Sequence, residues 1–439
     1  MMERDLPEGW ELVTIEQIGE IVTGGTPPKA SPDYYGHEIP FYKPTDLNAG
    51  YHTSSASENL SALGATKARL LPEKSILVTC IGATIGKTGF IRKRGTSNQQ
   101  INSIIPFTFI SPEYIYFSCI SVDFQIQINK NSSSTTLPIL NKSRFSKLTI
   151  PIPPLAEQKR IVAKLDAAFV HLEKIKASLA RIPELLKRFR EAVLTQAVTG
   201  SVETIPLGNL HVDIQTGPFG SSLHKEDYIR GGVPVINPSH VKNGEILPDI
   251  KVTIGKNKLN ELKTFLLNDE DVILGRRGEM GRAAVYKADS GEMLCGTGSI
   301  ILRKSTGISS KFLCYFLRSP FCVRFLDTNS VGSTMINLNQ NIIKSLPFPK
   351  IGIEEQEQIV SKIEGLFFFA DSLEKQYYIL QQKIDALPQT ILTKAFRGEL
   401  VPQDPDDEPA AVLLEKIRKE MGKLGKKVRN QVMLDFVER

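Results

Sequence analysis

Cysteine and histidine are scarce in this sequence. Its 439 residues include five cysteines and six histidines. No two cysteines form a Cys-x-x-Cys pair, and no histidine lies at zinc-ligand spacing from a cysteine. Most of the cysteines have apolar neighbours in the sequence, which predicts buried free thiols in a reducing compartment. The composition therefore argues against a disulfide framework, and we expect no metal site.

Long apolar stretches are missing as well. The longest apolar run lies around Leu366–Ala370, far short of the roughly 20 residues that a membrane-spanning helix needs. The first ten residues, MMERDLPEGW, are polar and charged, unlike the apolar centre of a signal peptide. We therefore expect a soluble, cytoplasmic protein with no membrane partner.

The sequence also lacks the motifs of well-known catalytic sites. It contains no Gly-x-Ser-x-Gly and no His-Glu-x-x-His, and no glycine motif for S-adenosylmethionine is visible. Asn237-Pro-Ser-His240 falls short of the Asn-Pro-Pro-aromatic motif that methylates adenine. We therefore predict no catalytic residue in this chain.

One stretch, TCIGATIGKTG at residues 79–89, resembles the end of a phosphate-binding P-loop. A P-loop requires a glycine five positions before Gly86, and Ile81 stands there. A P-loop also opens a helix, whereas Thr88–Arg94 is typical of a strand. The stretch therefore predicts a tight glycine turn between two strands, and no nucleotide site.

Length and charge set the broad class. A chain of 439 residues predicts two or three domains, and 41% apolar residues are enough for packed cores. The formal net charge of +6 is mildly basic. Such a charge permits a nucleic-acid partner without requiring one.

The sequence contains an internal repeat that extends over most of the chain. Residues 155–164 (LAEQKRIVAK) match residues 353–362 (IEEQEQIVSK) without a gap, so that Glu157 corresponds to Glu355 and Gln158 to Gln356. The preceding segments repeat more loosely, and the glycine turn recurs with Arg282 in the place of Lys87. The order is therefore variable domain, helical segment, variable domain, helical segment and tail.

Each helical segment carries apolar residues at alternating steps of four and three. The first seam is Ile161, Leu165, Ala168, Leu172, Ile175, Leu179, Ile182, Leu186, Phe189, Val193, and the second is Ile359, Ile363, Leu366, Ala370, Leu373, Tyr377, Leu380, Ile384, Leu387, Ile391. Such heptads predict a coiled coil. We expect the two segments to pair in antiparallel fashion, with Pro183 and Pro388 kinking or ending them and Gly200 and Gly398 as stops.

Short β-rich runs, a few helical pieces and frequent Gly and Pro make each variable domain a compact α+β domain. The predicted fold is α+β: two α/β variable domains separated by two long helices that form an antiparallel coiled coil, with a pseudo-twofold internal repeat. The predicted limits are 1–152 and 201–350 for the variable domains, 153–200 and 351–400 for the helical regions, and 401–439 for the tail.

Polar and basic clusters in the variable domains are candidates for DNA contact. Arg, Lys, Asn and Gln can read base edges, and Lys and Arg also hold phosphates. Each residue alone is more often a solvated surface group. The candidates are Lys87, Arg92, Lys93, Arg94, Asn98, Gln99, Gln100, Ser221, His224, Lys225, Arg276, Arg277 and Arg282.

The repeat and its motifs resemble a known family. Residues 150–162 (IPIPPLAEQKRIV), 185–194 (LLKRFREAVL) and 394–400 (KAFRGEL) are similar to the specificity subunits of type I restriction-modification systems, most like the type IA group. The resemblance extends over essentially the whole chain. It is strong in the helical segments and weak in the variable domains.

This resemblance implies a mechanism. Each variable domain would be a target recognition domain that reads one half of a split double-stranded DNA target, and the helices would fix the spacer, with the domains about 34 Å apart. The chain would bind no cofactor; two modification subunits would use S-adenosylmethionine to methylate adenine N6, and two restriction subunits would use ATP and Mg. The expected docking residues for the modification subunits are Glu157, Gln158, Arg160, Glu355 and Gln356.

Two alternatives remain open at this point. The chain could be a coiled-coil scaffold with two ligand-binding heads that does not bind DNA, or an enzyme in its own right, which would need methyltransferase motifs. The sequence does not give the target bases or the half-site that each domain reads. It assigns no role to residues 426–439.

Overall fold

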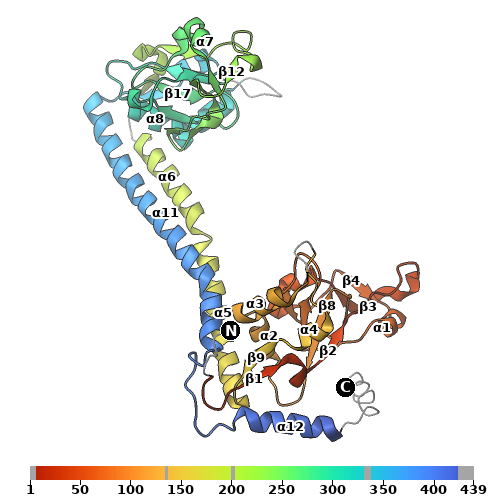
Figure 1. Ribbon diagram of the computed structural model, residues 1–439. Coiled ribbons are helices and arrows are strands. Elements are labelled where there is room, and N and C mark those ends of the chain that lie inside the picture. Colours follow the sequence, from red (N-terminus) through yellow and green to blue (C-terminus); the bar gives the residue numbers. More distant parts are fainter. Residues whose placement is uncertain (1–5, 134–136, 199–202, 331–337, 424–439) are drawn as a thin grey trace. The chain divides into compact units, whose positions relative to one another are not determined.

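The computed structural model describes residues 6–133, 137–198, 203–330 and 338–423 (Figure 1). The chain divides into two compact units. The first contains residues 1–177 and 381–439, and the second contains residues 178–380. Each unit holds one α+β domain together with parts of the long helices.

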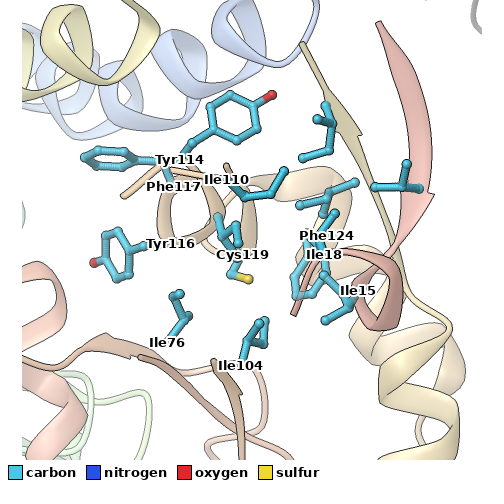
Figure 2. Close-up of a cluster of buried hydrophobic side chains, with 14 of the residues drawn as sticks. Ile15, Ile18, Ile76, Ile104, Ile110, Tyr114, Tyr116, Phe117, Cys119 and Phe124 are labelled. Carbon is cyan, nitrogen blue, oxygen red and sulfur yellow. The ribbon is translucent and has the colours of Figure 1, made fainter. Parts of the chain in front are cut away.

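A four-stranded antiparallel sheet forms the centre of the first unit. Its order is β2 (Gly19–Thr23), β8 (Ile101–Pro106), β5 (Ile76–Thr79) and β6 (Thr88–Phe90). One face packs on α2 (Pro112–Cys119) and α3 (Val122–Asn131), where Ile76 and Ile104 lie toward Tyr116 and Cys119 of α2 (Figure 2). Leu77 and Ile101 are buried on the other face, so the sheet has apolar residues on both faces.

Smaller elements complete the first unit. A second sheet has the order β4 (Glu58–Leu60), β3 (Tyr35–Tyr42), β7 (Thr96–Ser97), and β1 (Glu11–Thr14) pairs with β9 (Thr149–Ile152). The short helices are α1 (Ala62–Lys67), η3 (Asp46–His52) and α4 (Lys142–Ser146). The tail returns to this core, because Ala410, Leu413 and Ile417 of α12 (Ala410–Lys423) are buried in it.

The second unit repeats this construction. Its central antiparallel sheet has the order β11 (Ile214–Thr216), β20 (Ser299–Leu302), β17 (Val272–Gly275), β18 (Ala283–Val285), covered by α8 (Ser310–Arg318) and α9 (Pro320–Asn329). The second sheet has the order β12 (Tyr228–Ile229), β16 (Thr253–Ile254), β13 (Val233–Ile236), β19 (Leu294–Cys295). The remaining elements are β10 (Thr204–Pro206) with β21 (Pro347–Pro349), β14 (Val241–Lys242) with β15 (Glu245–Ile246), α7 (Lys256–Glu261) and α10 (Gln340–Lys344).

The two prolines of the helical segments have different effects. The first segment is broken into α5 (Leu155–Leu179) and α6 (Ile182–Val198), and Pro183 lies in the first turn of α6, where its missing N–H is harmless. The second segment is one helix, α11 (Ile353–Ala395), which continues through Pro388. The predicted end of a helix at Pro388 is therefore wrong, because Leu392 and Ala395 beyond it are anchored in the first unit's core.

Helix α11 ends shortly before Gly398, the glycine expected to stop it. Gly398 has a φ of +74°, a left-handed conformation that glycine adopts without strain. The N–H of Glu399 donates to the carbonyl of Lys394 at 2.9 Å, and that of Gly398 to the carbonyl of Ala395 at 3.3 Å. These two bonds form a Schellman motif, and the glycine stop predicted at Gly398 is confirmed. Gly200 lies outside the described residues.

The helices pair in antiparallel fashion within each unit, as predicted. In the second unit, Arg190 of α6 forms ion pairs with Asp371 at 2.6 Å and Glu374 at 2.7 Å. Farther along α6, Val193 and Leu194 pack against Ile363, earlier in α11. In the first unit, Lys176 of α5 lies 3.5 Å from Asp385. Residue numbers therefore increase along one helix and decrease along the other, as in an antiparallel pair.

The predicted apolar seam of α11 has one buried and one exposed row. Ile363, Ala370, Tyr377 and Ile384 are buried, whereas Leu366, Leu373, Leu380 and Leu387 keep 37–46% of their surface exposed. Phe368 and Phe369 nearby are exposed by 79% and 57%. We call the second set, together with Phe369, which lies on the same helix face, the exposed apolar row; Phe368 lies on a different face of the helix. A helix of this kind has more apolar surface than one partner helix covers.

All five cysteines are buried free thiols, as the sequence predicts. Across the described residues, no helix is long and apolar enough to cross a membrane.

Candidate nucleic-acid interface

In the first unit, loops from distant parts of the sequence meet at one end of the central sheet. Strands β2 and β5 end there and β8 and β6 begin there, because Thr23 pairs with Asn102 and Thr79 with Ile101. We call this edge the loop end of the sheet. It holds the segments that follow Thr23, Thr79 and Ser97.

A network of side-chain amides and a threonine hydroxyl orders the loop end. The buried Asn98 donates to Gln100 Oε1 at 2.8 Å, and its own oxygen accepts from the N–H of Gln100 at 3.2 Å. Gln99 is exposed and accepts from the hydroxyl of Thr26 in the neighbouring loop. Asn98 therefore positions its neighbours. Gln99 carries an exposed amide, whereas the amide of Gln100 is partly exposed and also donates to the Ile81 carbonyl at 3.4 Å.

Lys87 lies at the same end, on the glycine turn. Gly82 and Gly86 both have positive φ, of +102° and +86°, and the turn joins strands β5 and β6. The predicted strand–turn–strand is confirmed. A side chain at Gly86 would meet Gln125 Oε1 at 2.1 Å, so the Gln125 side chain would have to move to admit one. Lys87 Nζ donates to Asn48 Oδ1 at 2.7 Å and is partly exposed.

The Arg92–Arg94 cluster is not part of this group. Strand β6 runs away from the loop end, so these residues follow its opposite end. The Arg92 guanidinium lies 4.4 Å from the ring centre of Tyr51 and 4.6 Å from that of Phe90, and its Nε donates to the Tyr51 carbonyl at 3.0 Å. Arg92 is thus fixed within an aromatic cluster. Lys93 and Arg94 are exposed.

The second unit brings its arginines to the corresponding loop end. Arg276 and Arg277 follow β17, and Arg282 precedes β18. Arg282 donates to Glu279 at 2.8 and 3.0 Å and to the Pro238 carbonyl at 3.3 Å. Gly278 and Gly281 have positive φ here too, so the basic glycine turn occurs in both units.

Arg276 is the more enclosed of the two adjacent arginines. Burial, and then the charge of Arg277, lower the pKa of its guanidinium. Its Nε is buried without a hydrogen-bond partner among the described residues. Arg277 is exposed. The arrangement concentrates positive charge at the loop end, and an anionic ligand would reduce the repulsion between these charges.

Ser221, His224 and Lys225 lie in the loop that follows β11, and all three are exposed. The backbone of His224 donates to Asp227 at 2.7 Å and opens the short helix η5 (Lys225–Asp227). Sequence reasoning missed Phe219 in this loop, which is 76% exposed. Its signal is an aromatic residue between glycines, in Gly217-Pro-Phe-Gly220. Exposed aromatic side chains at such places can stack on bases or wedge between them.

Three of the five expected docking residues are buried. Gln158 accepts from the N–H of Ser111 at 2.9 Å and donates to the Pro153 carbonyl at 2.9 Å. Gln356 repeats this in the second unit, accepting from Ser309 at 2.9 Å and donating to Ile351 at 3.0 Å. Ser111 and Ser309 are the N-caps of α2 and α8. Each glutamine thus joins a recognition domain to its long helix, and we call this the glutamine joint.

Glu157 is the third buried residue. Its Oε2 accepts from the indole N–H of Trp10 at 3.0 Å, and its Oε1 has no hydrogen-bond partner among the described residues. Burial raises the pKa of Glu157, against the opposing effects of Trp10 and Arg160. Arg160 forms a bidentate pair with Asp407 at 2.6 and 3.2 Å. Of the five, only Glu355 is exposed. The three buried side chains are not accessible for direct contact with a docked subunit.

Comparison with known proteins identifies the family. Residues 7–184 and 212–380 match the family described as the type I restriction modification DNA specificity domain. The chain belongs to this family. It is 30% identical to the StySPI specificity subunit of Salmonella potsdam over 96% of this chain and 97% of that one, and 27% identical to the EcoKI specificity subunit of Escherichia coli K12 over the same shares.

The fold agrees with solved members of the family. The HsdS subunit from Thermoanaerobacter tengcongensis superimposes with a TM-score of 0.65, at 18% identity, over 91% of this chain and 99% of that chain. A chain from a structure of type I R-M complex assembly gives 0.67 at 18% identity, over 90% and 100%. The α+β fold with paired long helices is therefore confirmed.

Membership of this family confirms or excludes several of the expectations drawn from the sequence. The chain is a DNA specificity subunit of the type I class, which is non-catalytic and binds no cofactor; S-adenosylmethionine and ATP are used by the other subunits. The non-DNA scaffold and the self-contained enzyme are both excluded by the family match. The match tests neither the listed DNA-contact and docking residues nor the predicted domain limits, which stay predictions.

Proposed function

We propose that each unit reads one half of a bipartite, asymmetric DNA target through the loop end of its central sheet. In the first unit the readers would be Lys87, Gln99 and Gln100, and in the second Arg276, Arg277 and Arg282. Glutamine suits adenine and arginine suits guanine in the major groove, while lysine holds phosphate. The observation that carries the proposal is the repetition of one basic glycine turn at the same sheet edge in both units.

The paired helices would set the spacer between the half-sites and receive two modification subunits. The exposed apolar row of α11 supports the second role, because a surface of adjacent leucines with Phe369 is more apolar than a solvated helix face requires. The docked subunits would flip the target adenine out of the duplex and methylate its N6. Two restriction subunits would complete the assembly, and a cytoplasmic location stays a prediction.

The test uses the complex. The chain is co-expressed with its modification subunit in a host without adenine methylation, and N6-methyladenine is mapped across the genome. We expect one bipartite motif with a fixed gap. Absence of new methylation in a complex of verified composition would overturn the proposal.

Variants then assign the half-sites. Gln99→Ala should relax one half of the motif and Arg277→Ala the other, each leaving the opposite half unchanged. Glu73→Gln, an exposed substitution in the turn before β5, at the end of the sheet opposite the loop end, is the control for both. If either loop-end variant relaxed both halves equally, that residue would not be a base reader.

A further inference from the structure

The aromatic cluster of the first unit has Tyr51 at its centre. The Tyr51 ring lies 5.4 Å from Phe90, 5.1 Å from Tyr116 and 5.0 Å from Phe117, and it carries the Arg92 guanidinium over its face. Tyr51 comes from η3, which approaches closely because Gly50 has a φ of +52°; a Cβ there would be 3.1 Å from the Tyr116 hydroxyl. The Tyr51 side chain thus places its phenol ring in a site formed by these aromatic residues.

The phenol of Tyr51 interacts with Asp166 of α5. Burial raises the pKa of Asp166, and the interaction with Tyr51 lowers it. Burial, and then the charge of Asp166, raise the pKa of Tyr51 to about 12. In the first unit, therefore, both the ring of Tyr51 and its hydroxyl have interaction partners.

The second unit has the same site without the tyrosine. The strand pairings place Val285 where the first unit has Phe90, since Val272 pairs with Val285 as Ile76 pairs with Phe90. The repeat places Tyr315 at the position of Phe117, and Glu364 at that of Asp166.

The segment that replaces η3 leaves this site open. It is the hairpin β14–β15, whose turn, Asn243-Gly244, has positive φ at both residues. The hairpin supplies no aromatic ring. The space is instead a cavity of about 380 Å³, lined by Gly244, Val285, Cys314, Tyr315, Arg318 and Glu364 among others. A cavity of roughly 150 Å³ is enough to hold benzene.

We propose that this cavity binds a planar aromatic group with a hydroxyl, a phenol, in the position that Tyr51 occupies in the first unit. The ring would lie against Val285 and Tyr315, with the Arg318 guanidinium nearby, 5.6 Å from the centre of the Tyr315 ring. The hydroxyl would donate to Glu364, whose other oxygen accepts from Lys311 at 2.7 Å. The proposal is independent of how the chain reads DNA.

The phenol could belong to a free metabolite or to a tyrosine side chain of a partner protein. Both offer the same ring and hydroxyl, and they differ in the chain attached to the opposite carbon. Lys287 and Ser290 belong to the lining of the cavity and are exposed, so the site can be reached from solvent by either source.

The first measurement uses the full-length chain and saturation-transfer NMR with 4-methylphenol, the side-chain analogue of tyrosine, and with toluene as the matched probe without a hydroxyl. We expect 4-methylphenol to bind with a Kd on the order of 1 mM, as ligands of this size do, and at least about five-fold more tightly than toluene because of the hydrogen bond. Equal binding of both probes, or none, would overturn the proposal.

Two variants locate the site. Val285→Phe installs the first unit's residue and should abolish binding by filling the cavity. Glu364→Ala leaves the cavity open and should reduce the preference for 4-methylphenol over toluene to about one-fold, so it tests the proposal even where Val285→Phe fails to fold. Unchanged binding in both variants would place the ligand elsewhere and overturn the assignment.

A capped Gly-Tyr-Gly peptide distinguishes the sources. Displacement of 4-methylphenol by the peptide supports a partner's tyrosine as the occupant, and failure to displace it supports a free phenol. The same peptide with phenylalanine in place of tyrosine is the control, and it should not compete. Competition by the phenylalanine peptide equal to that of the tyrosine peptide would contradict the role of Glu364.

Discussion

Lys87 and Lys93 lie near opposite ends of the short strand β6, and only Lys87 belongs to the loop end. Lys87→Ala should lower the slope of log K against log salt for DNA binding by about one counterion, because one phosphate contact is lost. Lys93→Ala is the matched control and should leave the slope unchanged. The measurement is a salt titration of DNA binding by the complex. Equal slopes for the two variants would refute the assignment of the loop end.

Glu157 makes stability depend on pH in a defined direction. Because burial raises its pKa above the ordinary 4.5, the folded state keeps this proton to higher pH than the unfolded chain. Its contribution to stability is present at low pH and is lost as pH rises from about 4.5 through the raised pKa. Glu157→Gln keeps an acceptor for Trp10 and cannot ionise, so its stability relative to wild type should increase over this range.

The single tryptophan makes this measurable. Trp10 donates to Glu157 and is the only tryptophan in the chain, so its fluorescence follows unfolding of the first unit in urea. Glu355→Gln, at the matching exposed position of the second copy, controls for loss of a carboxylate. Parallel stability curves for wild type and Glu157→Gln would contradict the argument.

Helix α11 carries Pro388 in its interior, and this has a measurable cost. Proline has no N–H, so the carbonyl of Ile384 has no donor from that position within the helix. Pro388→Ala should raise the free energy of unfolding by about 1–3 kcal/mol. Calorimetry measures it, with Pro183→Ala, in the first turn of α6, as the control that should gain nothing. A destabilised Pro388→Ala would mean that the ring itself is needed for packing.

Elements with local signals were predictable from the sequence. The helices follow from apolar residues repeated every three or four positions, and the basic glycine turn follows from Gly82 and Gly86. The glutamine joint was not predictable, because Gln158 and Gln356 look like surface residues on a helix. Their burial depends on the caps of α2 and α8, some 47 residues earlier in each copy. The stacking of Arg92 on Tyr51 was not predictable for the same reason, since it is a contact between distant residues.

At the scale of the whole molecule, the paired helices are expected to determine the spacer. Inserting about seven residues into α11 and into α6 keeps the buried row in register. The added length is about 10 Å, so the gap in the methylated motif should grow by about three base pairs while both half-sites stay the same. Genome-wide methylation mapping measures this. A longer helix with an unchanged gap would refute the spacer role.

The glutamine joint has a consequence for how such a chain can change over generations. The two joints use the same residue types, Ser111 with Gln158 and Ser309 with Gln356, at the same spacing in each copy. A recognition domain copied from one half of the gene into the other would therefore meet the attachment that it already fits. The reading loops can be inherited as exchangeable cassettes, and a new specificity can arise by recombination within one gene, without any new joint having to evolve.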